Sequence, residues 1–237
     1  RARPNDSIVF IDLTKFRGWA NQEPNAKIAI SNRSCPWRFE KTPDGFAKIP
    51  TMPLAYTLSS KAIGSYAVGR KLADICKPRQ GVKTGNNDKF LKFWHEITRS
   101  SASLSNDDLA PGKRWFACAK GGDFRKWYGN NEYVIDWESD GKRIRNYVDS
   151  NGRQLSRPQN ISHFFKGGLT WSTLTVASIS MRLLPTYAAF ESKGSTIPES
   201  DPQARMSLLG FLNSAVVNEL MKATSPTMDY GEGAVGR

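Results

Sequence analysis

The chain has 237 residues and is strongly basic, with 34 Lys and Arg against 22 Asp and Glu, a formal net charge of +12 and a pI near 9.7. A positive field of this kind favours polyanions, and with 39% hydrophobic residues and seven Trp the chain can fill a core rather than act as a basic tail. It has neither the long apolar stretch of a spanning helix nor a lipidation signal, so we expect no membrane partner.

The cysteines and histidines indicate no metal centre. Cys35, Cys76 and Cys118 are widely spaced and lack Cys-x-x-Cys partners, which argues against a disulfide framework and against a zinc ribbon. We interpret them as reduced thiols of a cytosolic protein. His95 and His163 lie far apart in aromatic surroundings, where core packing or a surface hydrogen bond is the simpler expectation.

The first part of the chain mixes strand and helix signals. In chain order we expect strands at 8–13 and 27–31, a short apolar run at 54–58 and a helical region at 59–76. Gly64 and Gly69 could divide that helical region in two. Because the first residue is Arg1 rather than Met, and residues 230–237 run out in glycines, we expect a piece of a longer protein.

After Pro78 the pattern becomes rich in strands, separated by Gly, Asn and Asp turns. Strands are expected at 89–97, 115–119, 133–137, 169–176 and 179–184. A final helix is predicted at about 206–223 and ended by Pro226. Its apolar face would consist of Leu208, Leu209, Leu212, Val216, Leu220 and Met221. The expected fold class is α+β, an irregular strand-rich domain with flanking helices.

The strongest chemical signal is the run KRWFACAKGGDFRKWY at 113–128, which interleaves five Lys or Arg with five aromatic residues around a Gly-Gly pair. Cations neutralise phosphates, flat rings stack on bases, and glycines let the main chain approach both. The alternative is two amphipathic strands joined by a glycine turn, because Trp and Phe are also ordinary core residues. The net charge favours the nucleic-acid interpretation.

Two other patterns resemble active sites. Asp123, Asp136 or Glu138, and Asp140 followed by Lys142, mimic the acids with which metal-dependent nucleases hold a cation. Asp140 precedes a glycine, which is a turn signal first, so we favour a turn and keep the nuclease as an alternative. The glycines at 81–85 lack the Gly-Lys-Thr/Ser triplet of a phosphate loop and predict a tight loop instead.

Five stretches together carry a family resemblance. They are Ile49-Pro50 with Pro53-Leu54-Ala55-Tyr56, GVKTGNNDKF at 81–90, KGGDFRKWYG at 120–129, RPQN at 157–160 with GLTWS at 168–172, and LLGFLNS at 208–214. In order and spacing, from about residue 8 to 230, they resemble the C-terminal half of adenine-specific DNA methyltransferases of the BREX phage-defence type, the PglX family. A fainter likeness links them to the specificity domains of TaqI-like restriction-modification enzymes.

The resemblance implies a large, cytoplasmic bacterial protein whose N-terminal Rossmann-like domain binds S-adenosylmethionine and methylates adenine N6. This chain would be its target-recognition region, with 1–78 as a connector and first part and 79–237 as a strand-rich target-recognition domain. The sequence lacks a glycine-bearing cofactor loop and an Asn/Asp-Pro-Pro-Tyr/Phe/Trp motif, so we expect no catalytic, cofactor-binding or metal-binding residue in this segment. The expected partners are double-stranded DNA, the N-terminal methyltransferase domain of the same chain, and other defence-system proteins.

Residue chemistry suggests which side chains would touch DNA. The cations expected to neutralise phosphates are Lys83, Lys113, Arg114, Lys120, Arg125, Lys126 and Arg157. The side chains expected to hydrogen-bond base edges or phosphates are Thr84, Asn86, Asn87, Gln159 and Asn160. Trp127 and Trp171 would stack or wedge, and for Trp171 we favour core packing. The DNA-binding hypothesis requires the excess cations to gather on one face of the molecule. Besides the nuclease, a second alternative is a non-catalytic scaffold in a defence complex.

Overall fold

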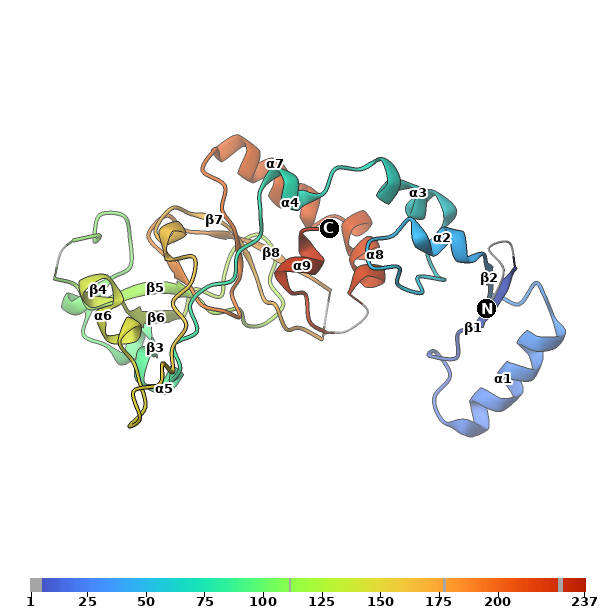
Figure 1. The fold of residues 1–237 in the computed structure, drawn as a ribbon, viewed down its shortest axis with the longest axis horizontal. Helices are drawn as coiled ribbons and strands as arrows, with labels where there is room; N and C mark the ends of the chain where they lie inside the picture. Colours follow the sequence, from blue (N-terminus) through green and yellow to red (C-terminus); the bar gives the residue numbers. More distant parts are fainter. Residues whose placement is uncertain (1–5, 111, 177, 226–227) are drawn as a thin grey trace. The chain divides into compact units, whose positions relative to one another are not determined.

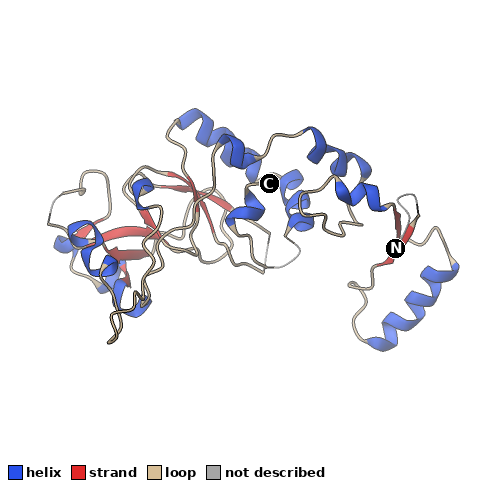
Figure 2. Cartoon of the chain, in the orientation of Figure 1, coloured by secondary structure: helices blue, strands red, loops and turns tan. Residues whose placement is uncertain are grey.

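The computed structural model describes residues 6–110, 112–176, 178–225 and 228–237. The chain divides into two compact units, Arg1–Arg70 and Lys71–Arg237, here called unit 1 and unit 2. Both units contain helices and strands, which Figures 1 and 2 show, so the predicted α+β class is confirmed. The domain boundary after residue 78 stays a prediction.

Unit 1 surrounds a small aromatic cluster. Strands β1 (Ile8–Ile11) and β2 (Arg38–Lys41) pair antiparallel, and the helices are α1 (Trp19–Ser31), α2 (Pro43–Ala47) and α3 (Ser60–Val68). Phe10 of β1 stacks on Tyr56 with ring centroids 4.9 Å apart, and its ring lies edge to face with Phe46 at 5.7 Å. The predicted first strand is confirmed over four residues, and the predicted helical region is divided at Gly69, where α3 ends.

The predicted strand at 27–31 is wrong, because these residues form the last turns of α1. Ile28 and Ile30 suggested a strand, but a short β-branched run is ambiguous between the two structures. Local side-chain contacts one turn apart support the helix: Lys27 pairs with Glu23 at 2.6 Å, and Ser31 donates to the carbonyl of Lys27. Both isoleucines remain exposed.

Unit 2 is built on two sheets. The first has the order β3-β6-β5-β4, with β9 also pairing with β5. Its strands are β3 (Leu91–Phe93), β4 (Ala102–Ser103), β5 (Trp115–Ala119), β6 (Tyr133–Asp136) and β9 (Ala189–Phe190). The second sheet has the order β10-β7-β8 and is antiparallel. Its strands are β7 (Gly168–Trp171), β8 (Met181–Leu184) and β10 (Thr196–Ile197).

Helices complete unit 2, and each sheet has its own hydrophobic core. The α-helices are α4 (Leu72–Ile75), α5 (Asn87–Phe90), α6 (Glu138–Arg145), α7 (Pro202–Leu212), α8 (Ala215–Thr224) and α9 (Glu232–Val235). The short 3₁₀ turns are Trp94–Glu96, Arg99–Ser101 and Ile161–His163. Phe90, Ile135 and Phe190 belong to the core of the first sheet. The core of the second sheet joins Trp171 to the buried residues of α7 and α8.

The strand predictions in unit 2 hold best for β5 and β6, the two central strands of the first sheet. Strand β5 matches its prediction, and β6 stops one residue early, at Asp136. The stretch at 89–97 forms a strand only over Leu91–Phe93, because a helical turn precedes it and a 3₁₀ turn follows it. The stretches at 169–176 and 179–184 are strands over Gly168–Trp171 and Met181–Leu184.

The predicted C-terminal helix is two helices, since the chain breaks between α7 and α8 at residues 213–214. Asn213 leaves the helix because its side-chain amide binds the main chain of Met181, accepting from N–H at 2.9 Å and donating to C=O at 3.0 Å. Ser214 then caps α8 by accepting from the N–H of Val217. The break turns Val216, expected on the apolar face, to the surface. The predicted stop at Pro226 lies outside the described residues.

Candidate nucleic-acid interface

The basic-aromatic run at 113–128 folds into a strand and a loop. Trp115 and Cys118 of β5 are buried, so the first half of the run belongs to the sheet. At its start, Lys113 donates to the carbonyl of Ser100, and Arg114 binds the buried carboxylate of Asp136 through Nε at 3.1 Å and a terminal nitrogen at 3.0 Å. These two cations, predicted as phosphate contacts, therefore already have partners within the fold.

The second half forms residues 121–131, here called the aromatic loop. Its backbone takes positive φ angles at Gly121 (92°), Gly122 (119°), Trp127 (75°) and Gly129 (122°), a region that favours glycine. A Cβ atom at Gly121 would lie 2.7 Å from the carbonyl oxygen of Lys193, closer than such atoms approach. The glycines that suggested a nucleic-acid surface are thus required for the path of the loop itself.

The aromatic loop is tied to the second sheet of unit 2. The N–H of Trp127 donates to the carbonyl of Met181, and the N–H of Leu183 donates to the carbonyl of Trp127, both at 2.9 Å. The ammonium group of Lys126 donates to the carbonyl of Asn213 at 2.7 Å. Since the main chain is bound on both sides of Trp127, the loop has one defined position against β8.

A buried arginine, Arg182 of β8, holds the loop from beneath. Its guanidinium donates to the carbonyl of Arg125 and to the hydroxyl of Ser172, both at 3.2 Å, and that hydroxyl donates to the carbonyl of Gly122 at 2.8 Å. Burial lowers the pKa of Arg182 to about 10, while Glu132 acts in the opposite direction. Arg182 therefore stays charged at neutral pH and links two points of the loop.

The side chains at the tip of the aromatic loop face solvent. Phe124, Trp127 and Tyr128 are 49%, 52% and 65% exposed, although each is large and apolar enough to be buried in a core. Arg125 is exposed and pairs with Glu132 at 3.3 Å, an interaction between two half-exposed groups that contributes little to stability. The loop thus presents three rings and a guanidinium on a fixed backbone.

The loop that starts at Gly81 uses its polar side chains internally. Thr84 is buried and donates to Oδ1 of Asn87 at 2.6 Å. Oδ1 of Asn86 accepts from the N–H of Lys89 at 3.0 Å and caps the short helix α5. The same three residues were predicted to face DNA. In this structure their oxygen atoms close the turn.

The structure brings the stretch at 157–160 against this loop. Lys83 and Arg157 exchange main-chain hydrogen bonds at 3.0 and 2.7 Å, and both side chains are exposed. The amide of Gln159 donates to the Gln80 side chain at 2.7 Å, and the amide of Asn160 donates to the Gln80 carbonyl at 2.9 Å. The two segments, both predicted to contact DNA, thus meet in space, and two of the four predicted base-reading amides, those of Gln159 and Asn160, hold them together.

The two tryptophans of the prediction differ. Trp171 is fully buried in β7 and donates from Nε1 to the carbonyl of Tyr230 at 2.7 Å, so its ring is part of the core, as the sequence favoured. Trp127 is exposed in the aromatic loop. Lys120, at the start of that loop, lies with Nζ 4.2 Å from the ring centroid of Tyr133, within range of a cation–π interaction.

Two acids of the nuclease alternative, Asp136 and Asp140, are paired with arginines. One oxygen of the buried Asp136 accepts from both Arg114 and Arg143, the latter at 2.7 Å. Asp140 pairs with Arg145 at 2.5 Å. Among the described residues, no group of three His, Cys, Asp or Glu side chains is arranged to hold a metal ion. Asp136 therefore organises two arginines at the end of β6.

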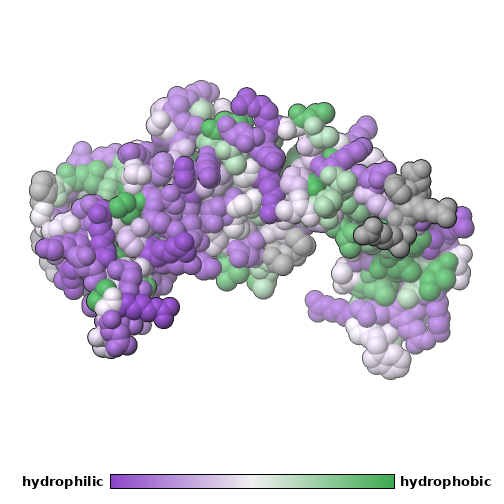
Figure 3. All heavy atoms as spheres, in the orientation of Figure 1, coloured by the Kyte–Doolittle hydropathy of each residue, from purple (hydrophilic) through white to green (hydrophobic). Residues whose placement is uncertain are grey.

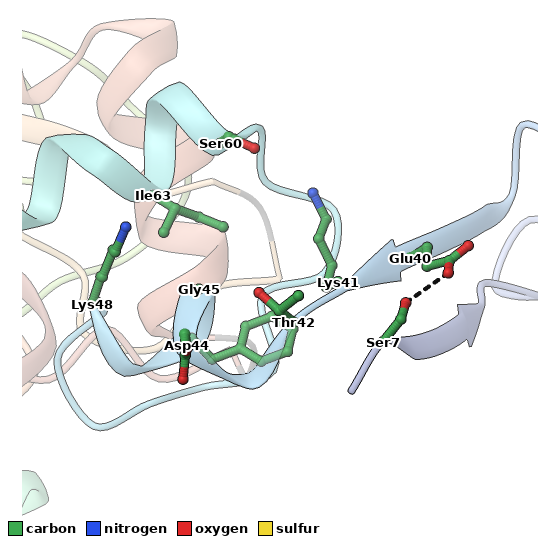
Figure 4. Close-up of a pocket in the computed structure, with 10 residues that line it drawn as sticks. Ser7, Glu40, Lys41, Thr42, Asp44, Gly45, Lys48, Ser60 and Ile63 are labelled. Atoms are coloured by element: carbon green, nitrogen blue, oxygen red, sulfur yellow. Dashed lines mark hydrogen bonds between the residues drawn. The ribbon is translucent and has the colours of Figure 1, made fainter. Parts of the chain in front are cut away.

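A cavity of about 360 Å³ lies in unit 1, lined in part by Lys41, Asp44 and Lys48 (Figure 4). Glu40 accepts from Ser7 at 2.7 Å, as the dashed line shows, and Lys41 donates to the carbonyl of Leu58. Both acidic and basic side chains line the cavity, and two of them, Glu40 and Lys41, have partners within the unit. Its electrostatics therefore favour no particular ligand class.

Comparison with known proteins gives a consistent result. No family model matches the chain. Over 94% of its length it is 35% identical to the adenine-specific methyltransferase PglX of Lacticaseibacillus casei, and over 98% it is 30% identical to the adenine-specific methyltransferase BrxX of Escherichia coli. This chain is homologous to a segment of PglX and BrxX. The family resemblance drawn from the five stretches is thereby confirmed.

The homologous segment is a minor part of these methyltransferases, since the chain spans 19% of the length of PglX and 18% of that of BrxX. The segment is thus one region of a much larger type of protein. None of the helices in the described part of the chain combines the length and apolar character needed to cross a bilayer.

Sequence reasoning missed two parts of this site. Arg182 had a usable signal, an arginine inside the apolar stretch MRLL, since a buried charge needs several partners. Phe124 and Tyr128 lay inside the basic-aromatic run but were not selected, because the sequence does not tell which ring is exposed.

Proposed function

We propose that this chain is the DNA target-recognition region of a site-specific N6-adenine methyltransferase of a bacterial phage-defence system. Homology to adenine-specific methyltransferases over nearly the whole chain carries the proposal. In this role the segment binds duplex DNA in the cytoplasm and positions the target adenine. Methyl transfer from S-adenosylmethionine belongs to the N-terminal domain of the longer protein, with other defence-system proteins as further partners.

The aromatic loop supports a role in DNA binding. Its rings and Arg125 are exposed on a backbone that Arg182, Ser172 and β8 hold in place, and preorganised contacts lose less entropy on binding. Lys83 and Arg157 add exposed cations beside one another. We assign Arg125, Lys83 and Arg157 to phosphates, and the rings of the loop to grooves or base steps.

Salt dependence tests the proposal. The purified protein that contains this segment is titrated with fluorescent duplex DNA at several salt concentrations, and the slope of log affinity against log salt is measured. Arg125→Ala should weaken binding to all sequences alike and make the slope shallower by about one unit. Lys222→Ala is a matched control, because Lys222 is an exposed cation in a surface pair with Glu219 at 2.6 Å.

The outcomes separate the functional classes. Binding that is steeply salt-dependent and sensitive to Arg125 supports recognition of DNA. Affinity that is unchanged by Arg125→Ala and by salt contradicts it and favours a scaffold. Cleavage of plasmid in the presence of magnesium, lost in Asp136→Asn, would favour a nuclease instead.

A further inference from the structure

A row of aromatic rings lies at the edge of the first sheet of unit 2, where β3 ends. The ring of Phe93 lies between those of Tyr133 and His95, with centroid distances of 4.6 and 5.4 Å and an angle of 6° between the Phe93 and His95 planes. Trp94 meets His95 edge to face at 5.7 Å. Phe93 is 37% exposed and Trp94 53%, so the row opens to solvent at Trp94.

The main chain holds Trp94 in this exposed position. Its N–H donates to the carbonyl of Glu132 at 2.9 Å, and the N–H of Phe93 donates to the carboxylate of Glu96 at 2.6 Å. The 3₁₀ turn Trp94–Glu96 is therefore anchored at both ends. Since half of the indole stays exposed, it gains only part of the burial energy of a core residue, and a cluster of fixed, exposed rings is typical of a surface that binds a partner.

The aromatic row is joined to the aromatic loop through Glu132. The carbonyl of Glu132 binds Trp94, and its carboxylate binds Arg125 of the loop at 3.3 Å. At the end of the row away from Trp94, the ammonium group of Lys120 lies 4.2 Å from the centroid of Tyr133, the last ring. A row of four rings thus runs from Trp94 to Tyr133, with one cation, Lys120, beside its last ring and another, Arg125, linked to it through Glu132.

We propose that Trp94 and the row behind it form a binding surface for single-stranded DNA, on which an unpaired base stacks while Lys120 meets the backbone. In a duplex both faces of each base are covered by neighbouring pairs, so an exposed ring finds a free π-face only on an unstacked nucleotide. Cations beside such a ring complement the phosphates. This inference deepens the proposed function and rests on it, because it assumes that the segment lies on DNA.

The test compares single-stranded and duplex DNA in one binding assay with the full-length protein. The probes are a fluorescent oligothymidylate of about 12 nucleotides and a duplex of equal length. Trp94→Ala should weaken binding of the oligothymidylate by about tenfold or more and change duplex affinity by less than about twofold. Trp94→Phe should keep most of the affinity, since a ring remains, and Lys120→Ala should make single-strand binding less dependent on salt.

Trp19→Ala is the matched control, because Trp19 is 79% exposed in unit 1 and belongs to neither surface. Equal affinity of the wild type and Trp94→Ala for the oligothymidylate, or no binding of it by the wild type, overturns the inference. Duplex binding that persists in that case leaves the proposed function intact. Single-strand binding that depends on Trp94, in a protein that does not bind duplex, supports this inference and contradicts the proposed function.

Discussion

Two parts of unit 2 were predicted to contact DNA, and they use their side chains in opposite ways. In the loop that starts at Gly81, Thr84, Asn86 and Asn87 close the turn and cap α5. In the aromatic loop, main-chain hydrogen bonds and Arg182 hold the loop in place, and Phe124, Trp127 and Tyr128 are left exposed. Polar side chains in a glycine-rich loop are thus used in hydrogen bonds that stabilise the loop itself. Aromatic rings that stay exposed after folding are the better sign of a binding surface.

Charge does not separate functional from structural regions. Counted from the sequence, residues 1–70 hold 11 basic and 5 acidic residues, and residues 71–237 hold 23 and 17, so each unit carries a net charge of +6. Figure 3 shows hydrophobic residues at the surface of unit 1, and Ile28 and Ile30 of this unit are exposed. The Gly81 loop and the aromatic loop therefore differ in which side chains already have hydrogen-bond partners within the fold, and not in net charge.

The largest expected effect comes from removing the support of the aromatic loop. Arg182→Met removes the hydrogen bonds that Arg182 donates to the carbonyl of Arg125 and to the hydroxyl of Ser172, and should lower the free energy of unfolding by about 3 kcal/mol. Arg182→Lys should restore part of this loss. Denaturant titration measures both, and stability equal to the wild type in Arg182→Met would contradict the assigned role of Arg182.

A smaller effect is expected at the start of the same loop. Gly121→Ala places a Cβ atom 2.7 Å from the carbonyl oxygen of Lys193 at a φ of 92°, and should cost about 2 kcal/mol. Gly210→Ala is the matched control, because a Cβ at Gly210 meets open space in helix α7. Thermal unfolding should show that Gly121→Ala is less stable than the wild type. It should also show that Gly210→Ala is more stable than the wild type, by about 0.5 to 1 kcal/mol.

A third prediction sharpens the contrast at the Gly81 loop. Asn86→Ala removes the cap of α5 and should cost about 1 kcal/mol, whereas Asn86→Ser keeps a capping oxygen and should cost only a few tenths. If Asn86 is structural, Asn86→Ser should also keep the preference for the cognate DNA sequence. A loss of discrimination of about 1 kcal/mol or more at one base pair in Asn86→Ser would show instead that its amide reads a base.

The smallest effect concerns His163, which follows the stretch at 157–160. Desolvation first, and then the positive charges of Arg79 and Lys166, lower the pKa of His163 from its usual 6.5. The unfolded chain therefore binds more protons at this site near that pH, so stability rises with pH through the interval below 6.5 and falls on acidification. His163→Gln should flatten the pH profile of the unfolding midpoint there, and an unchanged profile would contradict this.

The sequence alone was sufficient for the mixed fold class, for strands β1, β5 and β6, and for the family. Those strands are short apolar runs between turn residues, and the five stretches carry the family resemblance directly. It could not locate the break between α7 and α8. That break depends on Asn213 binding the main chain of Met181, which is far away in the sequence.

For the candidate site, the sequence determined that cations and rings occur together, because that is a property of composition. Only the tertiary structure decided which of them are available. The sequence favoured core packing for Trp171, but it did not show that Trp127 would be exposed. Exposure and hydrogen-bond partners arise from contacts between distant segments, such as Arg182 with the loop at Arg125, and no local pattern of residues encodes them.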